Sequence, residues 1–182
     1  MSDATPAHLA SPITASYPTN AEAPLTITDE SATTKTLVRS DQAQFGIIFG
    51  ASRMHGDALV AATRPDEWTI LGSVAAVEAA EADIDRGGFT SVIPFTHGRA
   101  LFRITGDDAA RMLEKVCGID WSDAMTPDGA VVSASVALTT CDIVRNDRVG
   151  TPSYVLVFDR SFGQYLFDAL VDAGAEFGLA VG

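Results

Sequence analysis

The chain has 182 residues, of which 47% are hydrophobic and 20% charged, so it can hold one domain with a real core but hardly two. Its formal net charge of -12 argues against nucleic acid and anionic membrane surfaces as partners, because phosphate binding needs clustered Lys and Arg. No apolar run approaches the roughly 20 residues that cross a bilayer, and the N-terminus lacks the features of a secretory signal, so we expect a cytoplasmic protein.

Two interpretations of the acidity remain open. Dispersed acidic residues can serve solubility or life in a salty cytoplasm, or they can form an acidic face for a basic partner. Lysine occurs only at Lys35 and Lys115, and the arginines are scattered from Arg39 to Arg160. The sequence favours the first interpretation.

Residues 1–44 are rich in Ala, Ser, Thr and Pro and show neither a helical nor a strand period. Such a segment buries too little apolar surface to offset the entropy lost on ordering. We therefore predict an N-terminal arm that is either flexible or ordered by lying across another protein. Residues 45–182 are expected to form a single α+β domain.

The domain is expected to begin with three short strands and a helix. Residues 45–49 and 58–62 are apolar runs on either side of a polar turn at 51–56, and residues 68–71 follow as a third strand. Ser73 then caps an alanine-rich helix that is expected to continue to about Arg86.

The next unit is a strand, a tight turn and a helix. Apolar and polar residues alternate over 100–105, which is the period of a half-buried strand. Gly106 can take the backbone angles that reverse the chain, and Asp107 or Asp108 can cap the helix that follows. Gly118 is the expected stop of that helix.

Further strands are expected in the second half of the chain. Residues 131–138 alternate again, and 142–144 either extend that strand or begin its neighbour. The stretch 146–150 is typical of a hairpin loop, because 154–158 is a strongly strand-forming run.

The last element is a helix that ends near Gly174, with Ser161 and Gln164 in the spacing of a capping box. It repeats the strand, turn and helix design of the earlier unit. The sequence therefore predicts an α+β fold, a mostly antiparallel sheet with packed helices.

Cysteine and histidine are too dispersed to define a metal site. Cys117 and Cys141 lie far apart and belong to no Cys-x-x-Cys pair, and His8, His55 and His97 are separated by more than forty residues. Cys117 falls on an apolar stripe, so a buried small hydrophobe is favoured over a reactive thiol.

Motifs for cofactor chemistry are also missing. The sequence has no dinucleotide or nucleoside triphosphate motif and no hydrolase elbow. His97 beside Arg99 could act as a base near a cation, yet a structural or interface role is favoured because no partner is visible. Arg99 and Arg160 could hold anions, but they are expected rather to anchor nearby carboxylates of the same chain or of a partner. We assign no catalytic, cofactor-binding or metal residue to this chain.

Several segments resemble one family when they are taken in order. Residues 96–110 look like a strand-turn-helix element of the aminomethyltransferase, folate-binding fold. Residues 64–68, Arg-Pro-Asp-Glu-Trp, resemble the Gly-Pro-Asp-Glu-Trp element of sarcosine oxidase gamma subunits, and 152–170 resemble their closing strand and helix. Residues 5–9, Thr-Pro-Ala-His-Leu, resemble the N-terminal Ser-Pro-Leu-Ala-His-Leu sequence of those subunits.

This resemblance implies the gamma subunit of a heterotetrameric sarcosine oxidase, a complex that oxidatively demethylates sarcosine to glycine. Its partners would be the alpha, beta and delta subunits. In that family FAD, FMN, NAD and tetrahydrofolate belong to the partner subunits, with no cofactor on the gamma chain. The chain itself is then expected to be non-catalytic and to serve assembly.

The alternative is a stand-alone folate-binding, aminomethyltransferase-like enzyme. Folate-using relatives carry a Gly-Gly-Ile-x-Asp-Asp-like element, and its counterpart here, residues 138–142, keeps one acid and loses the glycines. Asp142 without partners is expected to be a structural hydrogen-bond acceptor rather than a catalytic base.

Overall fold

Eleven strands and three α-helices are present in the computed structural model, which describes residues 10–20 and 23–182. The strands are β1 (Leu25–Asp29), β2 (Thr34–Ser40), β3 (Ser52–His55), β4 (Ala58–Arg64), β5 (Glu67–Gly72), β6 (Thr90–Pro94), β7 (Arg99–Gly106), β8 (Val131–Val136), β9 (Thr139–Arg145), β10 (Ser153–Asp159) and β11 (Ala180–Val181). The helices are α1 (Val74–Ala82), α2 (Ala109–Glu114) and α3 (Gly163–Gly174), with 3₁₀ turns at Arg160–Phe162 and Ala175–Phe177.

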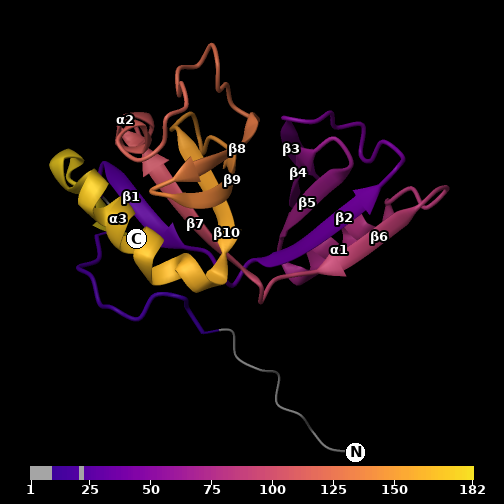
Figure 1. Ribbon diagram of the computed structural model, residues 1–182, viewed down its shortest axis with the longest axis horizontal. Coiled ribbons are helices and arrows are strands. Elements are labelled where there is room, and N and C mark those ends of the chain that lie inside the picture. Colours follow the sequence, from indigo (N-terminus) through magenta and orange to yellow (C-terminus); the bar gives the residue numbers. More distant parts are fainter. Residues whose placement is uncertain (1–9, 21–22) are drawn as a thin grey trace, which may run out of the picture.

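The strands form two separate sheets. Sheet A has the order β11-β1-β7-β10-β9-β8, and sheet B has the order β3-β4-β5-β2-β6. Among these strands only β1 and β11 pair in parallel. In Figure 1 the two sheets face each other, with α2 and α3 outside sheet A and α1 outside sheet B. The predicted α+β class with mostly antiparallel strands is confirmed.

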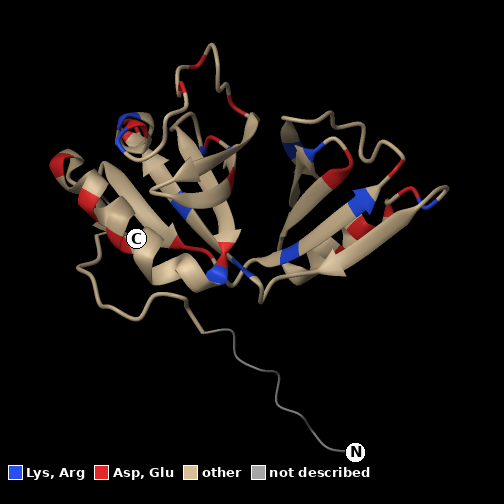
Figure 2. Cartoon of the chain, viewed as in Figure 1, with Lys and Arg blue, Asp and Glu red and all other residues tan. Residues whose placement is uncertain are grey.

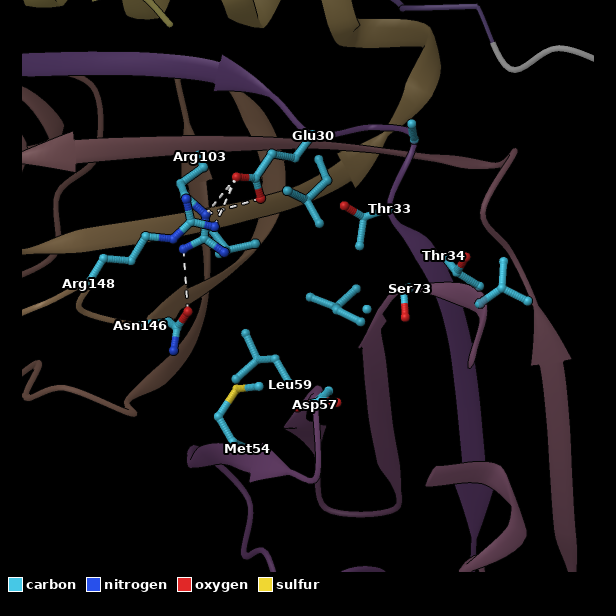
Figure 3. Close-up of a pocket in the computed structure, with 16 residues that line it drawn as sticks. Glu30, Thr33, Thr34, Met54, Asp57, Leu59, Ser73, Arg103, Asn146 and Arg148 are labelled. Carbon is cyan, nitrogen blue, oxygen red and sulfur yellow. Dashed lines mark hydrogen bonds and ion pairs between the residues drawn. The ribbon is translucent and has the colours of Figure 1, made fainter. Parts of the chain in front are cut away.

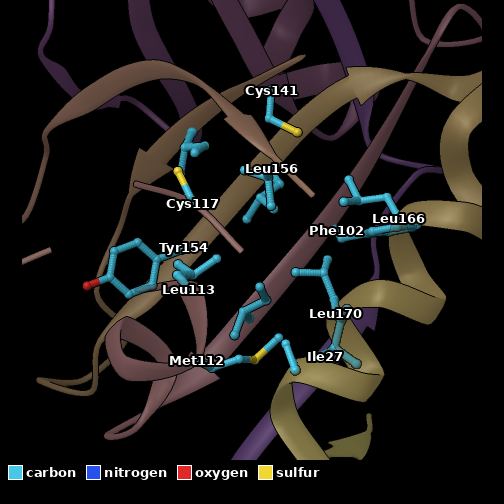
Figure 4. Close-up of a cluster of buried hydrophobic side chains, with 14 of the residues drawn as sticks. Ile27, Phe102, Met112, Leu113, Cys117, Cys141, Tyr154, Leu156, Leu166 and Leu170 are labelled. Atoms are coloured by element: carbon cyan, nitrogen blue, oxygen red, sulfur yellow. The ribbon is translucent and has the colours of Figure 1, made fainter. Parts of the chain in front are cut away.

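The largest core lies between sheet A and its helices (Figure 4). The rings of Phe102, Phe158 and Phe167 meet edge to face with centroids 4.8 and 5.2 Å apart. Cys117 and Cys141 are both buried in this core, as predicted for Cys117. Burial raises the pKa of the Cys141 thiol to about 12, so this thiol is protonated and unreactive at neutral pH.

A second apolar layer holds the two sheets together. It joins β4 and β5 to strands of sheet A, and β10 is buried on both faces as a result. That double burial explains why β10 is a continuous apolar run rather than an alternating one. The buried members are Leu59, Ala61, Leu71, Leu101, Val131, Val144, Val155 and Val157.

The predicted arm over residues 1–44 is wrong for its second half. Strand β1 lies inside sheet A between β11 and β7, and β2 lies inside sheet B between β5 and β6. Leu25, Ile27 and Val38 are completely buried. Each of these strands has few apolar residues and is stabilised by strands that are distant in the sequence. Local composition therefore does not predict them. Residues 1–9 of the predicted arm lie outside the described residues.

Residues 10–20 lie against α3 of the same chain. The side chain of Gln164 accepts hydrogen bonds from the backbone N–H groups of Thr14 and Ala15 at 2.7 and 3.0 Å. Tyr17 packs its ring against Phe167 at 4.9 Å and donates its hydroxyl to Asp168. Gln164 therefore holds residues 14 and 15 against α3. The predicted capping box of Ser161 and Gln164 is wrong, because Asp159 stands at the start of the 3₁₀ turn and accepts the N–H of Ser161.

Gly163 makes room for this docked segment, which gives a direct test of the contact. A Cβ at this position would clash with the ring of Pro12, approaching its Cγ to 3.0 Å. We expect Gly163→Ala to displace residues 10–20 while leaving α3 folded, because alanine favours helix by about 1 kcal/mol. Proteolysis of this segment is expected to accelerate by about tenfold. Gly118→Ala is the matched control, since nothing lies within 4 Å of its added Cβ, and equal rates for the two variants would contradict the contact.

Several predicted boundaries shift in the structure. The expected strand at 45–49 is a turn, and the polar stretch at 52–55 is β3, which pairs with β4 at the edge of sheet B. The helix after Ser73 is confirmed, with the Ser73 hydroxyl accepting the N–H of Ala76 at 3.2 Å, but it ends at Ala82. Strand β6 was not anticipated from the sequence, because its residues are half exposed at a sheet edge.

The turn between β8 and β9 carries backbone strain. Ala137 and Leu138 have φ angles of 44° and 66°, a conformation that favours glycine or asparagine. The carbonyl of Ala137 accepts a hydrogen bond from the Tyr165 hydroxyl at 2.9 Å, which helps to hold this turn against α3. Residues 142–144 belong to β9, the neighbour of β8, and the hairpin loop predicted at 146–150 joins β9 to β10.

Lys35 is completely buried, and its ammonium donates to the carbonyls of Ser31 and Thr33 at 2.8 Å each. Burial, followed by repulsion from Arg160, lowers the pKa of Lys35 from 10.5 to about 8. Between these two pH values the unfolded chain holds a proton that the folded chain has released. The contribution of Lys35 to the free energy of unfolding therefore rises with pH across this window.

Lys35→Met isolates this contribution. The difference in free energy of unfolding, wild type minus variant, is expected to rise by about 3 kcal/mol between pH 7 and 10.5. Cysteines and tyrosines also titrate in this range, but they cancel because both proteins contain them. Urea denaturation at a series of pH values measures this difference. A difference that stays constant with pH would show that folding does not lower the pKa of Lys35.

In Figure 2 acidic residues lie on helices and loops of both halves of the molecule. Within residues 10–20 and 23–182, no helix is long and apolar enough to cross a membrane.

Candidate functional site

A cleft of about 670 Å³ lies between the two sheets (Figure 3). Its position follows from the topology: the chain leaves β1 in sheet A and enters β2 in sheet B, so residues 30–34 cross from one sheet to the other. The cleft is lined by Glu30, Ala32, Thr33, Thr34, Met54, Asp57, Leu59, Leu71, Gly72, Ser73, Val74, Leu101, Arg103, Asn146, Arg148 and Val155.

One wall of the cleft carries an ion-pair cluster. The Nε of Arg103 donates to both carboxylate oxygens of Glu30 at 3.0 Å, and Arg148 donates to the same carboxylate at 3.1 Å. Arg103 also donates to Ser153 at 3.1 Å and to Asn146 at 3.4 Å. Figure 3 shows Glu30, Arg103, Asn146 and Arg148 converging from three segments of the chain.

Electrostatics set different roles for the two arginines. The side chain of Arg103 is only 9% exposed, whereas that of Arg148 is 53% exposed. Burial lowers the pKa of Arg103, and Glu30 opposes this shift, so the buried guanidinium stays charged because it is paired. Arg103 is thus a fixed structural cation, and Arg148 is the accessible one at the rim.

The remaining lining combines an apolar floor with the hydroxyls of Thr33, Thr34 and Ser73 and the carboxylate of Asp57. Leu59, Leu71, Leu101 and Val155 form the floor, which is part of the layer that joins the sheets. Glu30 already accepts three hydrogen bonds from guanidinium groups, so its carboxylate is engaged within the chain. We find no base and nucleophile pair among the residues that line the cleft.

Few acidic groups in the cleft are free to hold a folate. Glu30 is already engaged by two arginines, and Asp57 lies at the rim. No aromatic side chain is among the lining residues. The expectation that this chain binds no folate stays a prediction.

The residues singled out in the sequence do not gather in the cleft. His97 lines a shallow hollow with Phe95 and Thr96, and His55 pairs with Asp83 at 2.8 Å beside the ring of Phe45. His8 lies outside the described residues. Within the described part of the chain, no group of three or more His, Cys, Asp and Glu side chains could hold a metal ion.

Asp142 has the structural role expected for it. Its carboxylate accepts hydrogen bonds from Arg64 at 2.9 Å and from the hydroxyl of Ser133. The hydrogen bond that Arg64 donates to Asp142 and the negative charge of that carboxylate raise the pKa of Arg64, as expected for a stable ion pair. Arg160 donates to the carbonyl of Ala10 rather than to a carboxylate, so the expected carboxylate partner is not found among the described residues of this chain.

Sequence reasoning missed the cluster of Glu30, Arg103 and Arg148. Glu30 falls in the segment predicted as an arm, and Arg103 occupies the side of β7 that was taken as its solvent face. Leu101 lies on the same side as Arg103, and that apolar neighbour was the available signal that a second layer covers this face.

Comparison with known proteins places this geometry in a family. Residues 30–182 match the model of the GCVT N-terminal domain. A chain of the heterotetrameric sarcosine oxidase from Corynebacterium sp. U-96 is similar in structure, with a TM-score of 0.70 and 19% identity over 88% of each chain. The aminomethyltransferase T of the glycine cleavage system from Bartonella henselae gives a TM-score of 0.66 and 14% identity, over 87% of this chain and 48% of that one.

No curated protein sequence matches the chain. The two solved structures share its fold, and the chain spans about half the length of the aminomethyltransferase. The family model matches most of the sequence, including both sheets and all three helices except for β1. The chain therefore belongs to the GCVT N-terminal domain family.

Proposed function

We propose that the chain is the gamma subunit of a heterotetrameric sarcosine oxidase and that it serves assembly rather than catalysis. The observation that carries this proposal is length. The match to the sarcosine oxidase chain extends over 88% of both chains, whereas the match to the aminomethyltransferase leaves half of that enzyme without a counterpart. A chain that matches a chain of this complex over most of both lengths is suited to act as a subunit.

The chemistry of the cleft supports the same proposal. Glu30 is held by Arg103 and Arg148, and Asp142 is held by Arg64, so these two acids near the sheet interface are used in ion pairs. In this proposal FAD, FMN, NAD and tetrahydrofolate are bound by the alpha, beta and delta subunits, and those subunits carry out the oxidative demethylation of sarcosine. This chain would then stabilise the contacts among them.

Co-expression tests the proposal. The chain, with an affinity tag, is produced together with the three other subunits encoded by its source and then purified through the tag. We expect all four polypeptides in one fraction that oxidises sarcosine. Omission of this chain is expected to lower the yield of assembled complex, and full assembly and activity without it would contradict the proposed role.

A folate-binding, aminomethyltransferase-like enzyme is the second candidate, favoured by the family match and by a cleft large enough for a ligand. Titration of the isolated chain with tetrahydrofolate separates the two. The assembly role predicts no saturable binding. Tight binding that Arg148→Gln weakens, with Arg86→Gln as an exposed control, would favour the enzyme instead.

A further inference from the structure

A second cavity, of about 370 Å³, lies between the sheets and shares no lining residue with the cleft. Three arginines line it, and they come from three different strands: Arg39 from β2, Arg64 from β4 and Arg99 from β7. Ten arginines are present in the whole sequence. Three of them around one hollow is a local concentration of positive charge in a chain whose formal net charge is -12.

Most N–H groups of these arginines have no partner among the described residues. Arg39 uses only its Nε, which donates to Glu67 at 3.2 Å. Arg64 uses only its Nη1, which donates to Asp142 at 2.9 Å, to Ser133 and to the carbonyl of Thr63. The guanidinium of Arg99 makes no hydrogen bond or ion pair with any described side chain. Glu67 and Asp142 thus hold two of the guanidinium groups in place while leaving donors for a further acceptor.

The charge of the cavity selects the kind of anion. Three arginines and two carboxylates, Glu67 and Asp142, give a formal charge of 3 - 2 = +1. One negative charge neutralises the lining residues, whereas a doubly charged phosphate would leave an excess of negative charge beside Glu67, Asp142 and the nearby Asp159, which interacts with Arg99. A carboxylate also matches the planar fork of a guanidinium group through two parallel hydrogen bonds.

The other walls of the cavity are apolar. Leu37, Phe95 and Val157 line it beside the arginines, and Thr69 adds a hydroxyl. Such walls favour a ligand with an apolar body over a small inorganic ion, since burying apolar surface adds to the affinity. We propose that this cavity is a binding site for an organic monocarboxylate, with Arg99 as its principal anchor. This inference goes beyond the assembly role and does not depend on it.

Benzoate is a suitable probe because it combines one carboxylate with an apolar ring. Titration of the full chain at low salt, followed by calorimetry, is expected to give saturable binding. Neutral benzamide, which has the same shape without the charge, is expected not to bind. Arg99→Gln is expected to weaken the binding of benzoate by about tenfold. Arg86→Gln is the matched control, because Arg86 is exposed and also has no side-chain partner in the described residues, and it is expected to change nothing.

Four results would overturn the proposal, the last of them from a competition with sulfate. The first is the absence of saturable benzoate binding, and the second is equal binding of benzoate and benzamide. The third is an equal effect of Arg99→Gln and Arg86→Gln, which would indicate general attraction to positive charge. Sulfate is included as a competitor, and displacement of benzoate by sulfate at lower concentration would show that the site prefers an inorganic ion. Thermal unfolding of both variants confirms that they are folded.

Discussion

Replacement of Arg145 by methionine is expected to lower the free energy of unfolding by about 3–5 kcal/mol. The side chain of Arg145 is 7% exposed and donates to Asp147 at 3.0 and 3.1 Å. It also donates to Asp123 at 2.6 Å and to the carbonyl of Thr126 at 2.7 Å. These hydrogen bonds raise the pKa of Arg145. Its removal takes this donor from the buried carbonyl of Thr126 and leaves the carboxylate of Asp147 with the N–H of Ser153 at 3.2 Å.

The loop before β8 depends on this single guanidinium, which gives the change a local signature. Hydrogen exchange is expected to accelerate most in residues 120–130, because both Asp123 and Thr126 lose their anchor to β9. Arg39→Met is the control. The side chain of Arg39 is 54% exposed and its pairing with Glu67 is worth about 0–1 kcal/mol. Equal losses for the two variants, measured by urea denaturation, would contradict the anchoring role.

Gly106→Ala is expected to cost about 4 kcal/mol or more, or to prevent folding. Gly106 ends β7 with a φ of 148°, and an added Cβ would clash with the carbonyl of Pro24 and lie 2.9 Å from the Cα of Leu25. The clash falls on the backbone of β1, which is paired with β7 at this position. Neither strand can move without breaking the register that buries Leu25.

Gly150→Ala separates the cost of the backbone angle from the cost of the clash. Gly150 has a φ of 80° and nothing within 4 Å of an added Cβ, so only the angle is penalised, by about 1 kcal/mol. Thermal unfolding and soluble yield compare the variants. A loss for Gly106→Ala no larger than that for Gly150→Ala would show that the approach of β1 to β7 is not as close as described.

Elements with a strong local pattern could be predicted from the sequence. Strand β7 alternates and α3 carries an unbroken apolar stripe, so both were found close to their observed bounds. The stop at Gly118 was less accurate, because α2 ends at Glu114 and a turn follows. Asp108 also stands at the N-cap position without a cap hydrogen bond, since its carboxylate pairs with Arg111 at 2.6 Å.

Features that depend on distant parts of the chain could not be predicted. Strands β1 and β2 gain their stability from β7 and β5, and the division into two sheets follows from those pairings. The same limit applies to the sites. Glu30 and Arg103 are separated by 73 residues, and they meet only because β1 pairs with β7 and both lie at the edge of the cleft.

The pairing of acids with arginines links the fold to the proposed function. In the region where the sheets meet, Glu30 and Asp142 are both neutralised by arginines of the same chain. A fold shared with an aminomethyltransferase thus keeps its architecture while its acids stabilise the contact between sheets. That use of the acids is consistent with a subunit whose task is assembly, and it leaves the cavity around Arg99 as a separate feature.

Native mass spectrometry of the complex tests the central claim most directly. The chain is tagged in its source cells and purified under mild conditions, and the mass of the intact complex is measured. The assembly role predicts one species that contains this 19.1 kDa chain together with three different subunits. When the complex is dissociated, this species is expected to disappear. Recovery of the chain alone, as a stable monomer that binds tetrahydrofolate saturably, would contradict the claim.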